Sequence, residues 1–182
     1  MGAFITNFQA PTEMLDLEDR FQRGGISNIN MILSREQFPI PEWTVDKNAV
    51  VGDTVFFLCA RTSIDHIRHL CVQLRKAGQE SSALGLFAAQ QRDLYQKYAG
   101  FLVAIGRVAQ EPFQTEVSGW EDPHWRSPWY AKIDHIRLLN TPIHISQFRD
   151  FITVSRTGAI TKLTDAQLQA LSRMIADGKS CL

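Results

Sequence analysis

The chain has 182 residues, of which 45% are hydrophobic and 21% charged, as is ordinary for a globular protein with one core. Nineteen basic and nineteen acidic side chains give a formal net charge of zero, which excludes bulk attraction to nucleic acid or anionic membrane. The three cysteines are scattered without a CxxC pair, which excludes a disulfide framework and favours a reducing compartment. We find neither a signal peptide nor a transmembrane pattern, so we expect a cytoplasmic protein without membrane contact.

The first fifty residues predict a strand, a helix and a less regular stretch. Residues 2–9 are typical of a short strand, and Thr12 can cap a helix that runs to about Gln22. Residues 26–33 alternate weakly, as a strand would, and the prolines of residues 38–43 favour an extended or turning segment.

The middle of the chain predicts two buried strands with two helices between them. Apolar runs over residues 50–60 and 101–110 indicate the strands. Helical spacing of apolar side chains indicates helices over residues 63–77 and 82–98. Gly106, inside the second strand, predicts a bulge or the close approach of another segment.

The last third predicts one long strand and shorter elements. Residues 129–139 alternate as a half-buried strand whose phase shifts near His135 and which Pro142 should break. A short helix is expected over about residues 146–151, and residues 158–163 should be extended.

Thr164 and Gln167 form a capping box that should begin a last helix. Strands dominate the middle of the chain, helices surround them, and no phosphate loop joins a strand to a helix. This order predicts an α+β fold with a small curved or barrel-like sheet.

Metal binding is the first chemistry to weigh. His66 and His69 share a helix face, but Cys71 lies on the apolar side and no fourth ligand stands at a recognisable spacing. We therefore interpret the group as a partly exposed helix face and expect neither a metal nor another cofactor.

The sequence makes no positive case for an enzyme. Cys59 ends a strand, where a free cysteine is more typical of a small core side chain than of a nucleophile. There is no GxSxG, Walker or GxGxxG motif. The acidic pairs are consecutive in sequence, so their members do not face each other on a helix.

Two polar segments follow strands and could contact an anion. Arg61 and Ser63 lie where a strand ends and a helix begins, so a guanidinium and backbone N–H groups could hold a phosphate there. An ordinary helix cap is the alternative interpretation. Arg156 and Thr157 form a second polar group with the same two interpretations.

Tryptophan is concentrated in GWEDPHWRSPWY, residues 119–130, which has two prolines and should be a loop. Trp129 begins a strand in the apolar phase and is expected in the core. Trp43, Trp120 and Trp125 can instead line a pocket, because an indole face stacks on a base with about 1–3 kcal/mol of stabilisation. The alternative is a loop whose indoles plug the core.

The order of these segments resembles the EVE domain, which belongs to the PUA-like group with the YTH and ASCH domains. The resemblance covers about residues 50–175 through GDTVFFLCA, GFLVAIGRVAQEP, the tryptophan-rich loop, WYAKIDHIRLLNTPIHIS and SRTGAITKLTDAQLQAL. It implies a small, strongly bent β-barrel with surrounding helices. The whole of residues 1–182 would be one PUA/EVE-like domain, with a helical insertion at about residues 63–99 where the family has a short link.

The resemblance also implies a function, because EVE and YTH domains read modified bases in DNA or RNA through an aromatic pocket at the mouth of the barrel. The pocket aromatics of the family would correspond to Trp43 and to Trp120 or Trp125, and Asn7, Asn28 or Asn30 would read the base edge. The candidate ligand-binding residues are Trp43, Trp120, Trp125, Asn28, Asn30, Cys59, Arg61, Ser63, Arg156 and Thr157.

Two alternatives stay open at this point. The same pocket could serve a small-molecule-binding protein or an enzyme that takes a nucleotide or other heterocycle. The helical insertion could instead dock a protein partner. A local basic face for nucleic acid is available within or beside the insertion, from Arg61, Arg68, Arg75, Lys76, Arg92 and Lys97.

Overall fold

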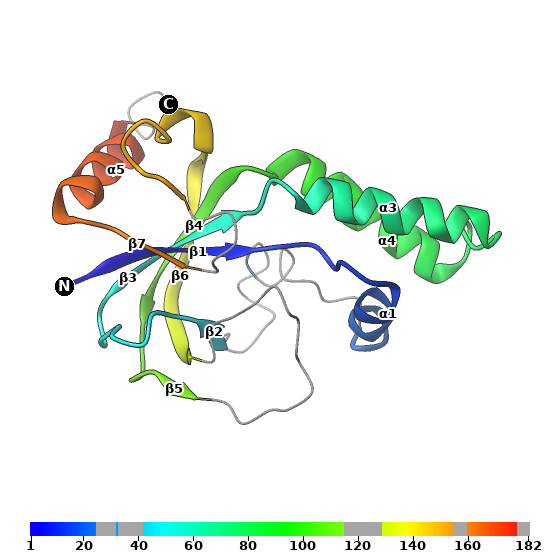
Figure 1. Ribbon diagram of the computed structural model, residues 1–182, viewed down its shortest axis with the longest axis horizontal. Coiled ribbons are helices and arrows are strands. Elements are labelled where there is room, and N and C mark those ends of the chain that lie inside the picture. Colours follow the sequence, from blue (N-terminus) through cyan, green and yellow to red (C-terminus); the bar gives the residue numbers. More distant parts are fainter. Residues whose placement is uncertain (25–31, 33–41, 115–128, 155–159, 178–182) are drawn as a thin grey trace. The chain divides into compact units, whose positions relative to one another are not determined.

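The computed structural model describes residues 1–24, 32, 42–114, 129–154 and 160–177 (Figure 1). The chain divides into two compact units. The sheet unit consists of residues 1–7, 35–58 and 101–182, and the helical unit consists of residues 8–34 and 59–100. The prediction of a single domain with a helical insertion stays a prediction.

The described strands form one seven-stranded, strongly curled sheet that makes a half-barrel (Figure 1). They are β1 (Ala3–Phe8), β2 (Glu42–Thr44), β3 (Thr54–Cys59), β4 (Phe101–Val108), β5 (Phe113–Gln114), β6 (Trp129–His144) and β7 (Ile160–Lys162). The order is β2-β6-β4-β3-β1-β7, and β5 pairs with β6. With the helices given below, this confirms the predicted α+β fold with a small bent, barrel-like sheet.

The sheet is mixed, because β1 and β3 run parallel while the other described pairs are antiparallel. The N–H of Thr54 donates to the carbonyl of Gly2, and that of Ala60 donates to the carbonyl of Phe8. Residue numbers therefore rise together along both strands. The pairs β2–β6, β6–β4, β4–β3, β5–β6 and β1–β7 are antiparallel.

A bulge in β6 confirms the predicted shift of phase near His135. Ile105 pairs with Arg137 and Arg107 pairs with Asp134, so two residues of β6 oppose Gly106 alone. His135 has a φ of 48°, which is uncommon for a residue other than glycine. A Cβ on residue 106 would lie 2.7 Å from Cγ2 of Ile133, so the predicted close approach at Gly106 is also confirmed.

The prediction that Pro142 breaks this strand is wrong, because β6 continues to His144. Leu102 pairs with Ile143 and Ala104 with Leu138, so the ladder is irregular between these two pairs. Pro142 lies in this irregular stretch, where its missing N–H removes no regular ladder bond. The helix expected over residues 146–151 is a shorter 3-10 turn, η1 (Ile145–Gln147).

The helix α5 (Asp165–Asp177) packs on the core of the sheet unit and begins directly after Thr164, where the capping box predicts its start. The N–H of Thr164 donates to Oε1 of Gln167 at 2.9 Å, and the N–H of Gln167 donates to Oγ1 of Thr164 at 3.3 Å. Leu168, Met174 and Ile175 pack against a core of Ala3, Ile5, Phe56, Leu58, Leu102, Leu139, Ile143, Phe148, Ile152, Leu163 and Leu171.

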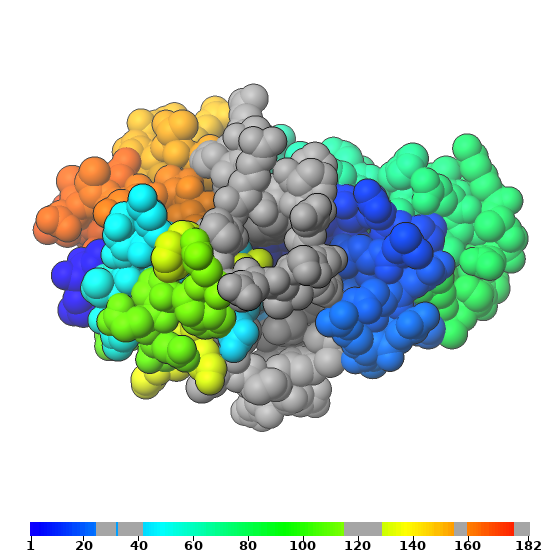
Figure 2. Space-filling model, turned by 60° about the horizontal axis from the view of Figure 1, so that its bottom comes forward, coloured from blue at the N-terminus to red at the C-terminus, as the bar shows by residue number. Residues whose placement is uncertain are grey.

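The helical unit contains α1 (Met14–Gln22), α3 (Ser63–Lys76) and α4 (Ala83–Tyr98), which confirm the helices predicted for these segments. α3 and α4 lie side by side (Figure 1), and Figure 2 shows α1 in blue beside the green surface of the two helices. Phe21 of α1 contacts Phe87 of α4 with ring centroids 5.7 Å apart. No helix of the described residues is both long and apolar enough to cross a bilayer.

Candidate ligand-binding site

Trp43 lies in the sheet unit, where the side chains of Thr6 and Phe57 hold it in place. The indole N–H of Trp43 donates to Oγ1 of Thr6 at 3.1 Å. Its ring meets Phe57 edge to face, with centroids 5.3 Å apart and an interplanar angle of 84°. The Thr6 hydroxyl in turn donates to the carbonyl of Thr44 at 3.4 Å. A buried indole is thus fixed by one polar and one aromatic contact.

These contacts bear on the expected role of Trp43. Its residue surface is only 7% exposed, so in the structure it is a packed member of the sheet unit. A pocket wall must offer a ring face to its ligand. The role of Trp43 as part of such a wall stays a prediction, and its rigid mounting is compatible with supporting neighbouring side chains.

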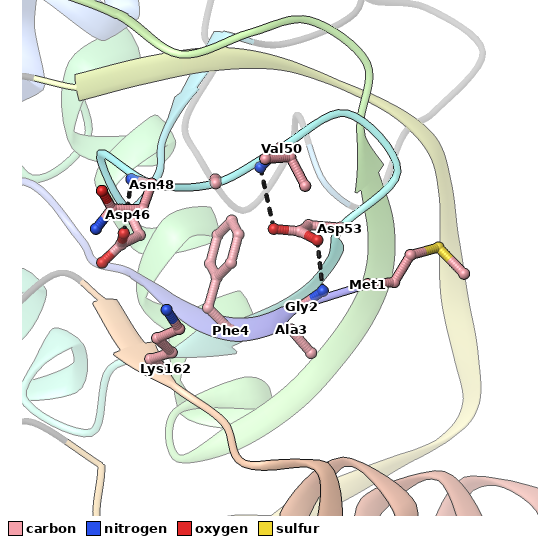
Figure 3. Close-up of a pocket in the computed structure, with 10 residues that line it drawn as sticks. Met1, Gly2, Ala3, Phe4, Asp46, Asn48, Val50, Asp53 and Lys162 are labelled. Atoms are coloured by element: carbon pink, nitrogen blue, oxygen red, sulfur yellow. Dashed lines mark hydrogen bonds between the residues drawn. The ribbon is translucent and has the colours of Figure 1, made fainter.

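The turn before β3 borders a pocket of about 230 Å³ (Figure 3). Asp53 lies in its wall with 5% of its surface exposed. One carboxylate oxygen accepts from the N–H of Gly2 and the other from the N–H of Val50 at 3.1 Å. The pocket is lined by Met1, Gly2, Ala3, Phe4, Asp46, Asn48, Ala49, Val50, Asp53 and Lys162.

The apolar run over residues 50–60 predicts a strand and does not indicate the role of the Asp53 carboxylate. Both oxygens of Asp53 already accept backbone N–H groups, so the side chain stabilises the structure. Asp46 likewise accepts the N–H of Asn48 at 2.8 Å. The glycine-aspartate pair in the sequence was the available signal, but the partner Gly2 is 51 residues away. We assign this pocket no ligand.

In the helical unit, Ser63 and Cys59 contact each other and are buried. Oγ of Ser63 accepts the N–H of Ala10 at 3.1 Å, which ties the segment after β1 to the start of α3. Burial raises the pKa of the Cys59 thiol to about 12, against a smaller lowering by its hydrogen bond with Ser63. A neutral, buried thiol is a poor nucleophile. Of the predicted polar group, Arg61 is exposed to solvent and Ser63 is not.

The two described cysteines should differ sharply in reactivity. At pH 8 we expect iodoacetamide to modify the half-buried Cys71 well before Cys59, and to reach Cys59 only as the protein unfolds in urea. Mass spectrometry of the two tryptic peptides measures both. Labelling of Cys59 at the rate of Cys71 in native buffer would contradict the buried position.

The same thiol should weaken the fold at alkaline pH. Burial raises the pKa of the Cys59 thiol to about 12, above the 9.0 of an unperturbed thiol. As pH rises, the unfolded state therefore loses this proton first. The contribution of Cys59 to the free energy of unfolding falls as pH rises from the pKa of the unfolded thiol to that of the folded thiol.

The remaining predicted site residues are only partly covered by the described chain. Asn7 lies half-buried in β1. The sheet unit carries Trp43, and the helical unit carries Cys59, Arg61 and Ser63. Six predicted residues lie outside the described residues: Asn28, Asn30, Trp120, Trp125, Arg156 and Thr157.

The histidines of α3 do not form a cluster of ligands with Cys71. His69 is exposed, and its Nε2 lies 3.0 Å from Nε2 of Gln73 on the next turn. Among the residues that the structure describes, no three His, Cys, Asp or Glu side chains come together in a way that could hold a metal ion.

Comparison with known proteins leaves the family of the chain undecided. No family model and no curated protein matches it. A similar solved structure is the X-ray crystal structure of protein Atu2648 from Agrobacterium tumefaciens, a structural genomics target. It is 11% identical, with a TM-score of 0.46 over 96% of this chain and 93% of that chain. This likeness decides neither family nor function.

Proposed function

We propose that the chain is a non-catalytic nucleic-acid-binding module of PUA/EVE-like fold that recognises a modified base in DNA or RNA. The segments that resemble the EVE domain support this proposal by their arrangement. They fall on β3, β4 and β6, which are neighbours in the curled sheet, and on β7 with α5. Motifs that are far apart in the sequence therefore lie on strands of one sheet and on the helix that follows its last strand.

The observation that carries the proposal concerns the loop with Trp120 and Trp125. Gln114 and Trp129, the described residues that flank this segment, are paired with each other. Trp43 pairs with Ala131, two positions further along β6. The strands β5 and β2 pair with opposite edges of the start of β6, since Tyr130 has both Phe113 and Thr44 as partners, so the residues that flank the tryptophan-rich segment and the strand of Trp43 share one short stretch of β6.

The charge of the protein favours recognition of a single base in a pocket over general attraction to the surface of a duplex. The net charge of zero supplies little general attraction to phosphate, so affinity must come largely from a specific pocket. Stacking on an indole contributes about 1–3 kcal/mol per base and is available to any flat ring. The hydrogen-bonded Trp43 would give such a pocket a rigid base.

Replacing Trp125 by alanine tests the proposal directly. We expect the affinity for the preferred strand to fall roughly 5- to 150-fold, since one stacking contact of about 1–3 kcal/mol is lost. Short oligonucleotides with 5-methylcytosine, 5-hydroxymethylcytosine or N6-methyladenine, each beside an unmodified strand, are titrated by fluorescence anisotropy. Trp120→Ala is measured in parallel, and Phe151→Ala is the matched control because Phe151 is an exposed aromatic ring outside the loop.

The outcomes separate the candidate functions. If folded Trp125→Ala and Trp120→Ala proteins both bind like the wild type, the loop is not the base site. If the wild type binds no strand but binds a free nucleoside with little salt dependence, the small-molecule alternative replaces the proposal.

A further inference from the structure

The helical segment is the basic part of a chain whose net charge is zero. Residues 59–100 carry six lysines and arginines against three aspartates and glutamates. The basic residues are Arg61, Arg68, Arg75, Lys76, Arg92 and Lys97, and the acidic residues are Asp65, Glu80 and Asp93. Part of the compensating acidic charge lies in and beside α1 of the same helical unit, on Glu13, Asp16, Glu18 and Asp19.

Helical spacing gathers several of these basic groups on one side of α3. The helix buries Ser63, Ile67, Leu70 and Leu74. Arg75 and Lys76 follow Arg68 by seven and eight residues, which is about two helical turns, and all three are exposed. They therefore lie on the side of the helix that faces away from its buried residues. Arg61 is exposed in the turn that precedes α3. We call the set Arg61, Arg68, Arg75 and Lys76 the basic face.

The basic face is weakly neutralised by the described parts of the protein. Arg75 contacts Glu80 at 3.4 Å, but the two side chains are 68% and 63% exposed. An ion pair that exposed adds little stability and exchanges readily for another anion. Among the described residues, no ion pair within 4.0 Å is found for Arg61, Arg68 or Lys76. Asp65 is the acidic residue on the exposed side of α3.

We propose that the basic face of α3 binds the phosphate backbone of nucleic acid. This inference rests on the proposed function and assigns a role to the helices that the EVE resemblance leaves unexplained. Arg68 and Lys76 are eight residues apart on the helix, or about 12 Å, which matches the rise of three to four phosphates along one duplex strand. A guanidinium group can donate two parallel hydrogen bonds to two oxygens of one phosphate.

A protein partner is less well supported by the same surface. Val72 is 42% exposed on α3 and Leu86 is 58% exposed on α4, but the described residues of α3 around Val72 are mostly charged or polar. Apolar residues that stand singly on a surface are normal and do not define a docking patch.

The double variant Arg68→Gln/Lys76→Gln tests this role. We expect its affinity to fall about 5- to 20-fold. The factor should be the same for modified and unmodified strands, because phosphate contacts carry no base information. The slope of log affinity against log salt between 50 and 200 mM should flatten by about 1.4 to 1.8, or 0.7 to 0.9 for each lost contact. The control Arg149→Gln/Arg173→Gln removes the same charge from exposed positions of the sheet unit and should change the slope by less.

Failure of this inference is distinguishable from failure of the proposed function. An unchanged affinity and salt slope in the double variant, with base discrimination retained, overturns the role of the basic face alone. Binding that weakens in the double variant but never distinguishes the modified strands supports the basic face and overturns base recognition. Binding of no strand by the wild type overturns both. Circular dichroism melts establish that each variant is folded.

Discussion

Replacing Asp53 by alanine is expected to lower the free energy of unfolding by about 3–5 kcal/mol, since a hydrogen bond to a charged group contributes about 1.5–3 kcal/mol. The carboxylate accepts the N–H groups of Gly2 and Val50 and is 5% exposed. Alanine leaves both donors without this acceptor, and both hydrogen bonds are partly buried. β1 would suffer most, because it stands between β3 and β7 in the sheet.

Urea unfolding followed by tryptophan fluorescence measures this loss. Asp46→Ala is the matched control, because its carboxylate also accepts a backbone N–H but does so at an exposed position. The control should cost less than about 1 kcal/mol, since surface substitutions away from buried features have small effects. An Asp53→Ala protein within 1 kcal/mol of the wild type would show that the buried contacts of this turn are replaceable.

The elements that could be predicted from the sequence are those whose signals are local. Ile67, Leu70 and Leu74 recur at the spacing of one helix side, and all three are buried in α3. Thr164 and Gln167 need only each other to begin α5. The shift of phase near His135 was visible because alternation along a strand is also a local pattern.

The contacts of the candidate site depend instead on residues far apart in the sequence. The indole of Trp43 finds its acceptor in Thr6, 37 residues earlier, and no spacing rule predicts that pair. A tryptophan beside prolines indicates a pocket wall, which stays a prediction, and the burial of Trp43 to 7% exposure in the sheet is not visible from that local pattern. The prediction that Pro142 ends its strand was wrong for a similar reason, because the irregular ladder that accommodates Pro142 depends on β4.

Replacing Gly85 by alanine should destabilise the helical unit by about 2–4 kcal/mol, at or above the usual range for overpacking. A Cβ at this position would clash with the carbonyl oxygen of Gln79 and would lie 2.5 Å from that of Glu80. Both are backbone atoms, so no side-chain rotation relieves the contact. At an open helical position the same change would stabilise by about 1 kcal/mol through helix propensity, so the expected sign is reversed.

The connection between α3 and α4 cannot move away without losing its own hydrogen bonds. The N–H of Gln79 donates to the carbonyl of Leu74 at 2.8 Å, and the Ser82 hydroxyl donates to the carbonyl of Gln79 at 2.7 Å. Ser82 also caps α4 by accepting the N–H of Gly85 at 3.0 Å. The clash therefore either strains this connection or removes the helix cap, which contributes about 1 kcal/mol.

Urea unfolding followed by circular dichroism at 222 nm reports on Gly85→Ala, because α1, α3 and α4 supply much of the helical signal. Leu86→Ala is the matched control on the next residue of α4, where the side chain is 58% exposed, and should stay within about 0.5 kcal/mol of the wild type. A Gly85→Ala protein as stable as the wild type would mean that the connection yields at little cost. The α3–α4 pair would then not be the rigid support that a phosphate-binding face on α3 requires.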